Sequence, residues 1–374
     1  TPSCAYVTSS LRMAALLHDV GHGPFGHFFD EHFLRQYGLT HETLGAQIIE
    51  DELGDLLRSL RRNPSGALED GETLEPGQIA WLIQRPTTAT ESTEWPGWLS
   101  HLRALLSGIY TVDNMDFVLR DAYMSGYNQR SVDVDRLLHY SFFSAAGLTI
   151  HDRGLDTLVR FMGVRAELFR TIYFHRTVRA IDLTLKDLFE ESREHLFPGD
   201  PREHLDEYQA FTEASLFTDV RRWMSHANPV KQTLGTRWNR LLAREISWRM
   251  ASQVNLVFGE SDHEAASIFS DSNLVEQKLR QQLGATASEI PLRIDIARHI
   301  HRPHTRGPVN GQNFLYDSSQ DQVRPLATHE LFSRMPISYR ICRAYVQDKS
   351  HVQPVAFALE SLVKGPGSDD LTNM

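Results

Sequence analysis

The sequence is poor in cysteine: Cys4 and Cys342 are the only two among 374 residues. Two cysteines exclude a disulfide framework and a metal site built on thiolates. We find no apolar run of about 18 residues, no signal peptide and no lipidation motif, so we expect a cytoplasmic protein without a membrane span. Acidic residues outnumber basic ones, with 48 Asp and Glu against 38 Lys and Arg. The net charge of -10 argues against nucleic acid as the main partner.

Apolar residues recur at helical spacing through much of the chain, as between residues 44 and 53 and between residues 99 and 125. Residues 61–100 are instead rich in Pro, Gly, Thr and Glu, which predicts a loop-rich insertion around one short helix near residues 79–83. A chain of this length can hold one large domain or two modest ones. The pattern predicts a mainly α protein.

The second half changes character toward its end. Residues 190–285 are predicted to be mainly helical, whereas turn-forming Pro, Gly and Asn recur among the residues that follow. We expect a core over residues 1–190, and a helical extension with a small mixed α+β C-terminal region over residues 191–374. Short strands are predicted at residues 148–151, 290–294, 309–315 and 339–345.

The densest group of titratable side chains lies between Ala14 and Glu31, directly behind an apolar run. Such groups are costly to bury unless they are paired or bound to a metal. Gly21 and Gly23 predict the end of a helix, and Pro24 suits the first turn of the next one. The group consists of His18, Asp19, His22, His27, Asp30 and Glu31.

This geometry predicts two kinds of chemistry. An imidazole nitrogen beside a carboxylate oxygen, as in His18-Asp19, is a ligand set for Zn, Mn, Fe or Ni. His27 and Asp30 share one helix face at i,i+3, which suits a carboxylate-oriented general acid or base. His22 would face the same cavity. A single His-Asp pair is more typical of a surface contact, but so many converging groups favour a metal site.

A distant carboxylate is a candidate to complete this site. Asp113 lies in the helix predicted around residues 99–125, on its apolar side. Such a buried carboxylate needs a partner, which a metal ion would supply. The alternative is a structural helix in which Asp116 pairs with Arg120 at i,i+4. The residues alone leave both interpretations open.

Positive charge gathers between residues 155 and 190, where Arg165, Phe169, Tyr173 and Arg176 fall along one side of a predicted helix. A guanidinium suits phosphate oxygens, and an aromatic ring suits a sugar or base. The alternative is a solvated basic face over aromatic core residues. Three further histidines, predicted to lie in loops rather than in a metal site, are His299, His301 and His304.

The string from His18-Asp19 through His22-Gly23-Pro24-Phe25 to His27 and Asp30 resembles the HD-domain metal-dependent phosphohydrolases. It is most similar to bacterial members of the deoxynucleoside triphosphate triphosphohydrolase branch, which also includes the SAM-and-HD-domain and dGTPase-like enzymes. The resemblance covers residues 11 to about 185 and implies an HD-domain helical bundle. It implies that a divalent ion, Mn, Mg, Fe, Ni or Zn, is bound by His18, Asp19 and Asp113.

The resemblance also implies the reaction, in which a deoxynucleoside triphosphate (dNTP) yields deoxynucleoside and triphosphate, and a homo-oligomeric assembly. His27, oriented by Asp30, would protonate the leaving oxygen, and His22 and His41 would contact the phosphate. Asn114 and Phe117 replace a Lys and a Tyr of the mammalian enzyme. The residues implied in substrate binding are Arg165, Tyr173, Asp121, Asn114 and Phe117.

One implied ligand has no counterpart. The resemblance places a further His on an earlier helix, and no His precedes His18. We therefore expect either a chain trimmed at its N-terminus or an incomplete site. Two alternatives stay open: a broader nucleotide phosphohydrolase, such as a nucleoside monophosphate phosphatase, and a catalytically impaired nucleotide-binding scaffold.

Overall fold

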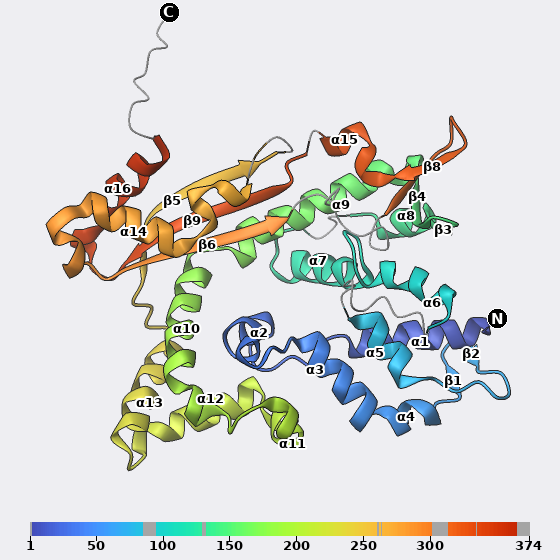
Figure 1. Cartoon of the computed structure of the whole chain (residues 1–374), viewed down its shortest axis with the longest axis horizontal. Coiled ribbons are helices and arrows are strands. Elements are labelled where there is room, and N and C mark those ends of the chain that lie inside the picture. Colours follow the sequence, from blue (N-terminus) through green and yellow to red (C-terminus); the bar gives the residue numbers. More distant parts are fainter. Residues whose placement is uncertain are drawn as a thin grey trace, which may run out of the picture. The chain divides into compact units, whose positions relative to one another are not determined.

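The computed structural model describes residues 2–84, 95–128, 132–259, 262, 264–300, 313–333 and 335–364. The protein is mainly helical with small sheets, which confirms the predicted fold class (Figure 1). Two compact units can be distinguished. The first comprises Thr1–Phe161, Phe189–Thr236 and Thr305–Leu326, and the second comprises Met162–Leu188, Arg237–His304 and Ala327–Met374. The domain boundary expected at residue 190 stays a prediction.

Short helices build the N-terminal part of the first unit. Local capping explains where three of them begin: Ser3, Thr40 and Thr111 each accept a hydrogen bond from a backbone N–H in the first turn of the helix that follows. The helices are α1 (Cys4–Leu17), α2 (His27–His32), α3 (His41–Gln47), α4 (Gly54–Ser59), α5 (Pro76–Ile83), α6 (Gly97–Leu102), α7 (Val112–Met124) and α8 (Val134–His139).

Helices α1 and α5 pack against each other, and the core between them and their neighbours is apolar. Ala14, Ile49 and Ile79 are among its fully buried side chains. The helix predicted near residues 79–83 is α5, which starts with Pro76 at its first position. The periodic stretch 99–125 is interrupted, because Gly108 takes a φ of +159° and Thr111 caps a new helix.

The first unit also holds a four-stranded sheet with the order β3-β4-β7-β8. The strand predicted at residues 148–151 is β4, and of the segment 309–315 only residues 313–315 lie within the described chain, with β7 beginning at Phe314. Strands β4 and β7 are parallel, and the other two pairs are antiparallel. The strands are β3 (Ser141–Ser144), β4 (Gly147–His151), β7 (Phe314–Asp317) and β8 (Gln322–Pro325). A hairpin of two strands, each two residues long, lies within the predicted insertion. Its strands are β1 (Arg62–Asn63) and β2 (Gly66–Ala67).

Helices α11 (Leu205–Ala210) and α12 (Glu213–Arg222) complete the first unit. Thr212 caps α12 with a reciprocal capping box to Ser215. Three longer helices have residues in both units: α9 (Leu155–Leu168), α10 (Arg176–Leu196) and α13 (Pro229–Leu242). The helix predicted between residues 155 and 190 is divided into α9 and α10 near a single π-helical turn, Phe169–Tyr173.

The second unit is an antiparallel sheet, ordered β5-β9-β6, with α14 (Ser272–Leu283) and α16 (Val352–Lys364) packed on it. A short helix, α15 (Glu330–Ser333), precedes β9 (Ser338–Val346). Strands β6 (Leu292–Ile300) and β9 confirm the strands predicted at residues 290–294 and 339–345. Strand β5 (Arg249–Phe258) was missed, because residues 190–285 were predicted to be mainly helical. Its alternating exposure, with Val254 and Leu256 inward, has the period of a strand.

In the part of the chain that the structure describes, no helix combines the length and the apolar character that a membrane span requires.

Candidate active site and metal centre

The turn after α1 is built so that it can pack closely against α3. A Cβ on Gly21 would lie 2.1 Å from the carbonyl oxygen of His41 and 2.4 Å from the backbone nitrogen of Gly45. No larger residue fits there, so glycine at this position brings the α1 terminus and the start of α3 into contact. The turn that directly follows His18 and Asp19 thereby lies against His41, the first residue of α3.

His18 lies close to each of the other two predicted metal ligands. The Nε2 atom of His18 is 3.2 Å from a carboxylate oxygen of Asp19 and 3.6 Å from Oδ1 of Asp113. Asp113 comes from the first turn of α7, far along the chain. On the opposite side of the ring, Nδ1 of His18 is 2.9 Å from the Ala15 carbonyl oxygen. A proton donated there leaves Nε2 as the basic nitrogen, which is how metal-bound histidines are usually held.

These distances fit a divalent ion. Ligand atoms bonded to one ion at about 2.1 Å in a tetrahedral arrangement lie about 3.4 Å from one another. The donor set of one imidazole nitrogen and two carboxylates suits the divalent metals that accept nitrogen and oxygen ligands. The structure therefore brings His18 within reach of each of the two carboxylates, and the role of the three residues as ligands of one ion stays a prediction.

A second group, His22, His27, Asp30 and His41, adjoins the first. Each of these residues offers one ligand atom, and the four atoms all lie within 4.8 Å of one another. The rings of His22 and His41 stack with centroids 3.8 Å apart. His27 is the exposed member, with 75% of its side chain accessible, and its Nδ1 atom lies 3.5 Å from Asp30.

Asp30 organises this second group. One of its oxygens makes a short hydrogen bond with Nδ1 of His41. Its other oxygen faces Nδ1 of His22 at 3.4 Å. Both of these facing atoms are buried and have no hydrogen-bond partner among the residues that the structure describes. A buried polar atom without a partner is costly, so this space suits a proton, a metal ion or a ligand atom.

Asp19 connects the two groups electrostatically. It lies between His18 and His22, 3.4 Å from Nε2 of the latter. Burial would raise the pKa of Asp19, but its bonds to these two histidines outweigh burial and hold the pKa well below its usual range. Hydrogen bonds with Asp113 and then Asp19 raise the pKa of His18 to about 10. Burial works against the charged form of His22, yet Asp19 and Asp30 raise its pKa to about 9.

The remaining predicted residues of α7 take different positions. Asn114 is buried, and its amide donates to the Thr111 hydroxyl at 2.7 Å, within the cap of its own helix. Asp121 is partly exposed, and one of its oxygens lies 3.4 Å from Nε of Arg120. Arg120 also pairs with Asp116, so that predicted ion pair exists alongside the placement of Asp113 beside His18. Phe117 is half-buried.

Arg165 and Tyr173 belong to the second unit. The guanidinium of Arg165 lies 5.6 Å from the ring centre of Phe169, and Tyr173 meets the same ring edge-on. Phe169 also stacks on His299, a buried residue of β6. The prediction that His299 is a loop histidine is wrong, because the strand continues to Ile300 and carries the ring inward. His301 and His304 lie outside the described residues.

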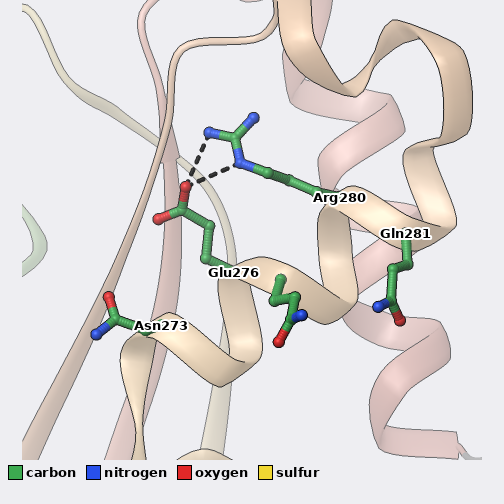
Figure 2. A pocket seen from close by; sticks show the side chains of 5 residues that line it. Asn273, Glu276, Arg280 and Gln281 are labelled. Atoms are coloured by element: carbon green, nitrogen blue, oxygen red, sulfur yellow. Dashed lines mark hydrogen bonds and ion pairs between the residues drawn. The ribbon is translucent and has the colours of Figure 1, made fainter.

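Several hollows lie in the described part of the second unit. One, of about 430 Å³, is lined by several arginines, among them Arg170, Arg176 and Arg340. A second hollow lies along α14, where Figure 2 shows Arg280 bonded to Glu276 beside the amides of Asn273 and Gln281. Arg280 also donates to the carbonyl of Ala287. Its charge is thus neutralised within the unit, and this second hollow offers no uncompensated group to a ligand.

Comparison with known proteins identifies the first unit's N-terminal part. Residues 8–79 match the family described as HD domain. This chain carries an HD domain. The matched stretch includes His18-Asp19 and the whole second group, whereas Asp113 lies beyond it.

The relatives that this chain matches are distant. It is 22% identical over 278 residues to the uncharacterized protein YwfO of Bacillus subtilis, which covers 70% of this chain and 57% of the relative. It is 28% identical over 199 residues to the deoxynucleoside triphosphate triphosphohydrolase SAMHD1 of chicken, which covers 49% of this chain and 32% of the relative. The chain thus spans little more than half, or less, of the length of these relatives.

A solved structure has a similar fold over nearly the full length of this chain. It is a hypothetical protein from Aquifex aeolicus, with a TM-score of 0.66 and 18% identity, and the match covers 94% of this chain and 79% of that one. At this level of identity the likeness concerns the fold alone.

Sequence reasoning did not single out two side chains that touch the site's backbone, Tyr208 and Glu213. Tyr208 donates to the carbonyl of Gly21, and Glu213 accepts from the backbone N–H of Phe25. Both come from the α11–α12 segment, and no local pattern in the sequence marks either residue.

Proposed function

We propose that this chain is a metal-dependent phosphohydrolase that cleaves deoxynucleoside triphosphates to deoxynucleoside and triphosphate. The observation that carries the proposal is the convergence of His18, Asp19 and Asp113 beside a second His/Asp group. The HD domain and the distant similarity to a named triphosphohydrolase support the reaction class.

The proposed ligands of the ion are His18, Asp19 and Asp113, a donor set compatible with Mn, Mg, Fe, Ni or Zn. When bound, such an ion supplies Lewis acidity and lowers the pKa of a bound water toward about 7.

The second group is proposed to bind and protonate the substrate. His27 is exposed and therefore able to reach a leaving oxygen, and Asp30 beside it would orient the ring. His22 lies 3.4 Å from carboxylate oxygens of both Asp19 and Asp30. Together with His41 it would bind a phosphate oxygen, and donors fixed there favour the negative charge that develops during hydrolysis.

The assignment is tested by incubating the full chain with each dNTP in the presence of Mn²⁺, Mg²⁺, Fe²⁺, Ni²⁺ or Zn²⁺ and separating the products. We expect deoxynucleoside and triphosphate, and we expect His27→Ala and Asp113→Ala to remove most turnover. Full activity in both variants would refute the roles given to them. Release of inorganic phosphate from monophosphates, without triphosphate from dNTPs, would indicate the broader phosphatase. Absence of both bound metal and turnover would indicate the scaffold.

A further inference from the structure

Two long-range hydrogen bonds hold the backbone of the turn that joins the two His/Asp groups. They come from residues 187 and 188 positions later in the sequence, in the α11–α12 segment of the same unit. They meet the turn at two separate points, one on each side of Gly23.

The first bond fixes the Gly21–His22 peptide group. The hydroxyl of Tyr208 donates to the carbonyl oxygen of Gly21 at 2.8 Å, and both residues are buried. Burial raises the pKa of this phenol, so the hydroxyl stays protonated and remains a donor. The side chain lies against Phe29 of α2, so the ring has a packing role of its own.

The second bond fixes the turn that leads to His27. The backbone N–H of Phe25 donates to Oε1 of Glu213 at 2.8 Å. Phe25 has a φ of +69°, a left-handed conformation that costs a non-glycine residue about 1–2 kcal/mol. Such a conformation persists only where surrounding contacts impose it. Glu213 supplies one of these contacts, and ring packing of Phe25 on Phe189 and Phe217 supplies the others.

We infer that the α11–α12 segment positions the His/Asp groups: Tyr208 sets the direction of the Gly21–His22 peptide, and Glu213 sets the turn from which His27 projects. Neither side chain belongs to the proposed ligands or proton donors, so both are positioning residues. The inference rests on the proposed function only for its effect on turnover. Its effect on the geometry of the histidines is independent of any reaction.

The alternative is that α11 and α12 only cover an apolar surface. Phe29 packs on both Tyr208 and Phe211, and such packing would survive the loss of a single hydroxyl. Tyr208→Phe therefore separates the two explanations, because it keeps the ring and removes the donor. Glu213→Ala and Glu213→Gln form a second pair, because the glutamine amide oxygen still accepts from Phe25 and the alanine does not.

The test records imidazole ¹⁵N spectra of the full chain, metal-free, and then titrates it with Mn²⁺ alone. We expect Tyr208→Phe and Glu213→Ala to shift or broaden the ring signals of His22 and His27 and to weaken Mn²⁺ binding about tenfold, the lower end of the range for residues that orient metal ligands. Glu213→Gln should resemble the wild type. Tyr6→Phe is the matched control, because it removes a hydroxyl bonded to Gln78 elsewhere in the same unit.

Unchanged histidine signals in both Tyr208→Phe and Glu213→Ala would overturn the inference, whatever their turnover. If Tyr208→Phe fails to fold, the Glu213 pair decides, since that side chain is exposed. A wild-type chain that gives the expected spectra but hydrolyses no dNTP would refute the proposed function and leave the positioning role intact.

Discussion

Nε2 of His18 lies 3.6 Å from Oδ1 of Asp113, so the end of α1 and the beginning of α7 present their side chains to one point. Asp113 stands in the first turn of α7, where the helix dipole favours a negative charge. Thr111 caps the same turn and limits its movement. The carboxylate is therefore held in place beside His18.

We expect Asp113→Asn to lower the affinity for Mn²⁺ at least tenfold, because the amide is a neutral and weaker ligand. Isothermal titration of the full chain measures the change. Asp116→Asn is the matched control on the same helix, since it breaks an exposed ion pair with Arg120 and should leave the affinity unaltered. Equal affinities in the two variants would show that Asp113 does not bind the ion.

His27→Ala is expected to lower dNTP turnover about 10²- to 10⁴-fold, the usual contribution of a positioned acid or base, while Mn²⁺ affinity stays near the wild-type value. Turnover and metal titration are measured on the same sample. A parallel loss of Mn²⁺ affinity would instead place the ion within the group of His22, His27, Asp30 and His41. His101→Ala, an exposed histidine on α6, serves as the control.

Gly21→Ala should destabilise the first unit by about 3 kcal/mol or more. The new methyl group would lie 2.1 Å from the His41 carbonyl oxygen, and backbone cannot yield as a flexible side chain does. Urea unfolding gives the free energy. Gly163→Ala is the opposite case, a glycine inside α9 whose Cβ would meet no atom within 4 Å. The free energy of unfolding of that variant should rise by up to about 1 kcal/mol, because alanine has a higher helix propensity than glycine.

Acid should weaken the second unit through Glu264. Its bond to Arg298, opposed by burial and assisted by Arg340, lowers the pKa of Glu264 from 4.5 to about 2. A carboxyl whose pKa is lower in the folded state stabilises the fold above about pH 4.5, and this contribution disappears as the pH falls toward 2. The difference in urea midpoint between wild type and Glu264→Gln should thus shrink between pH 7 and pH 3. A difference independent of pH would contradict the prediction.

Much of the local structure follows from the sequence alone. Ser3, Thr40 and Thr111 begin their helices, and apolar periodicity reveals the helical class. The adjacency of His18 and Asp19 is covalent, so their convergence needs no tertiary contact. Such features depend on residues within a few positions of one another, which is the range over which propensity and capping act.

Tertiary structure alone decided the rest. Asp113 meets His18, Tyr208 meets Gly21, and His299 turns inward only because whole elements pack together. Strand β5 likewise owes its place to pairing with β9, although its own residues alternate weakly. The chemical type of its side chain makes a histidine or an aspartate a candidate ligand. Which of them share one point in space depends on the burial of apolar surfaces far along the chain, and no local pattern encodes that.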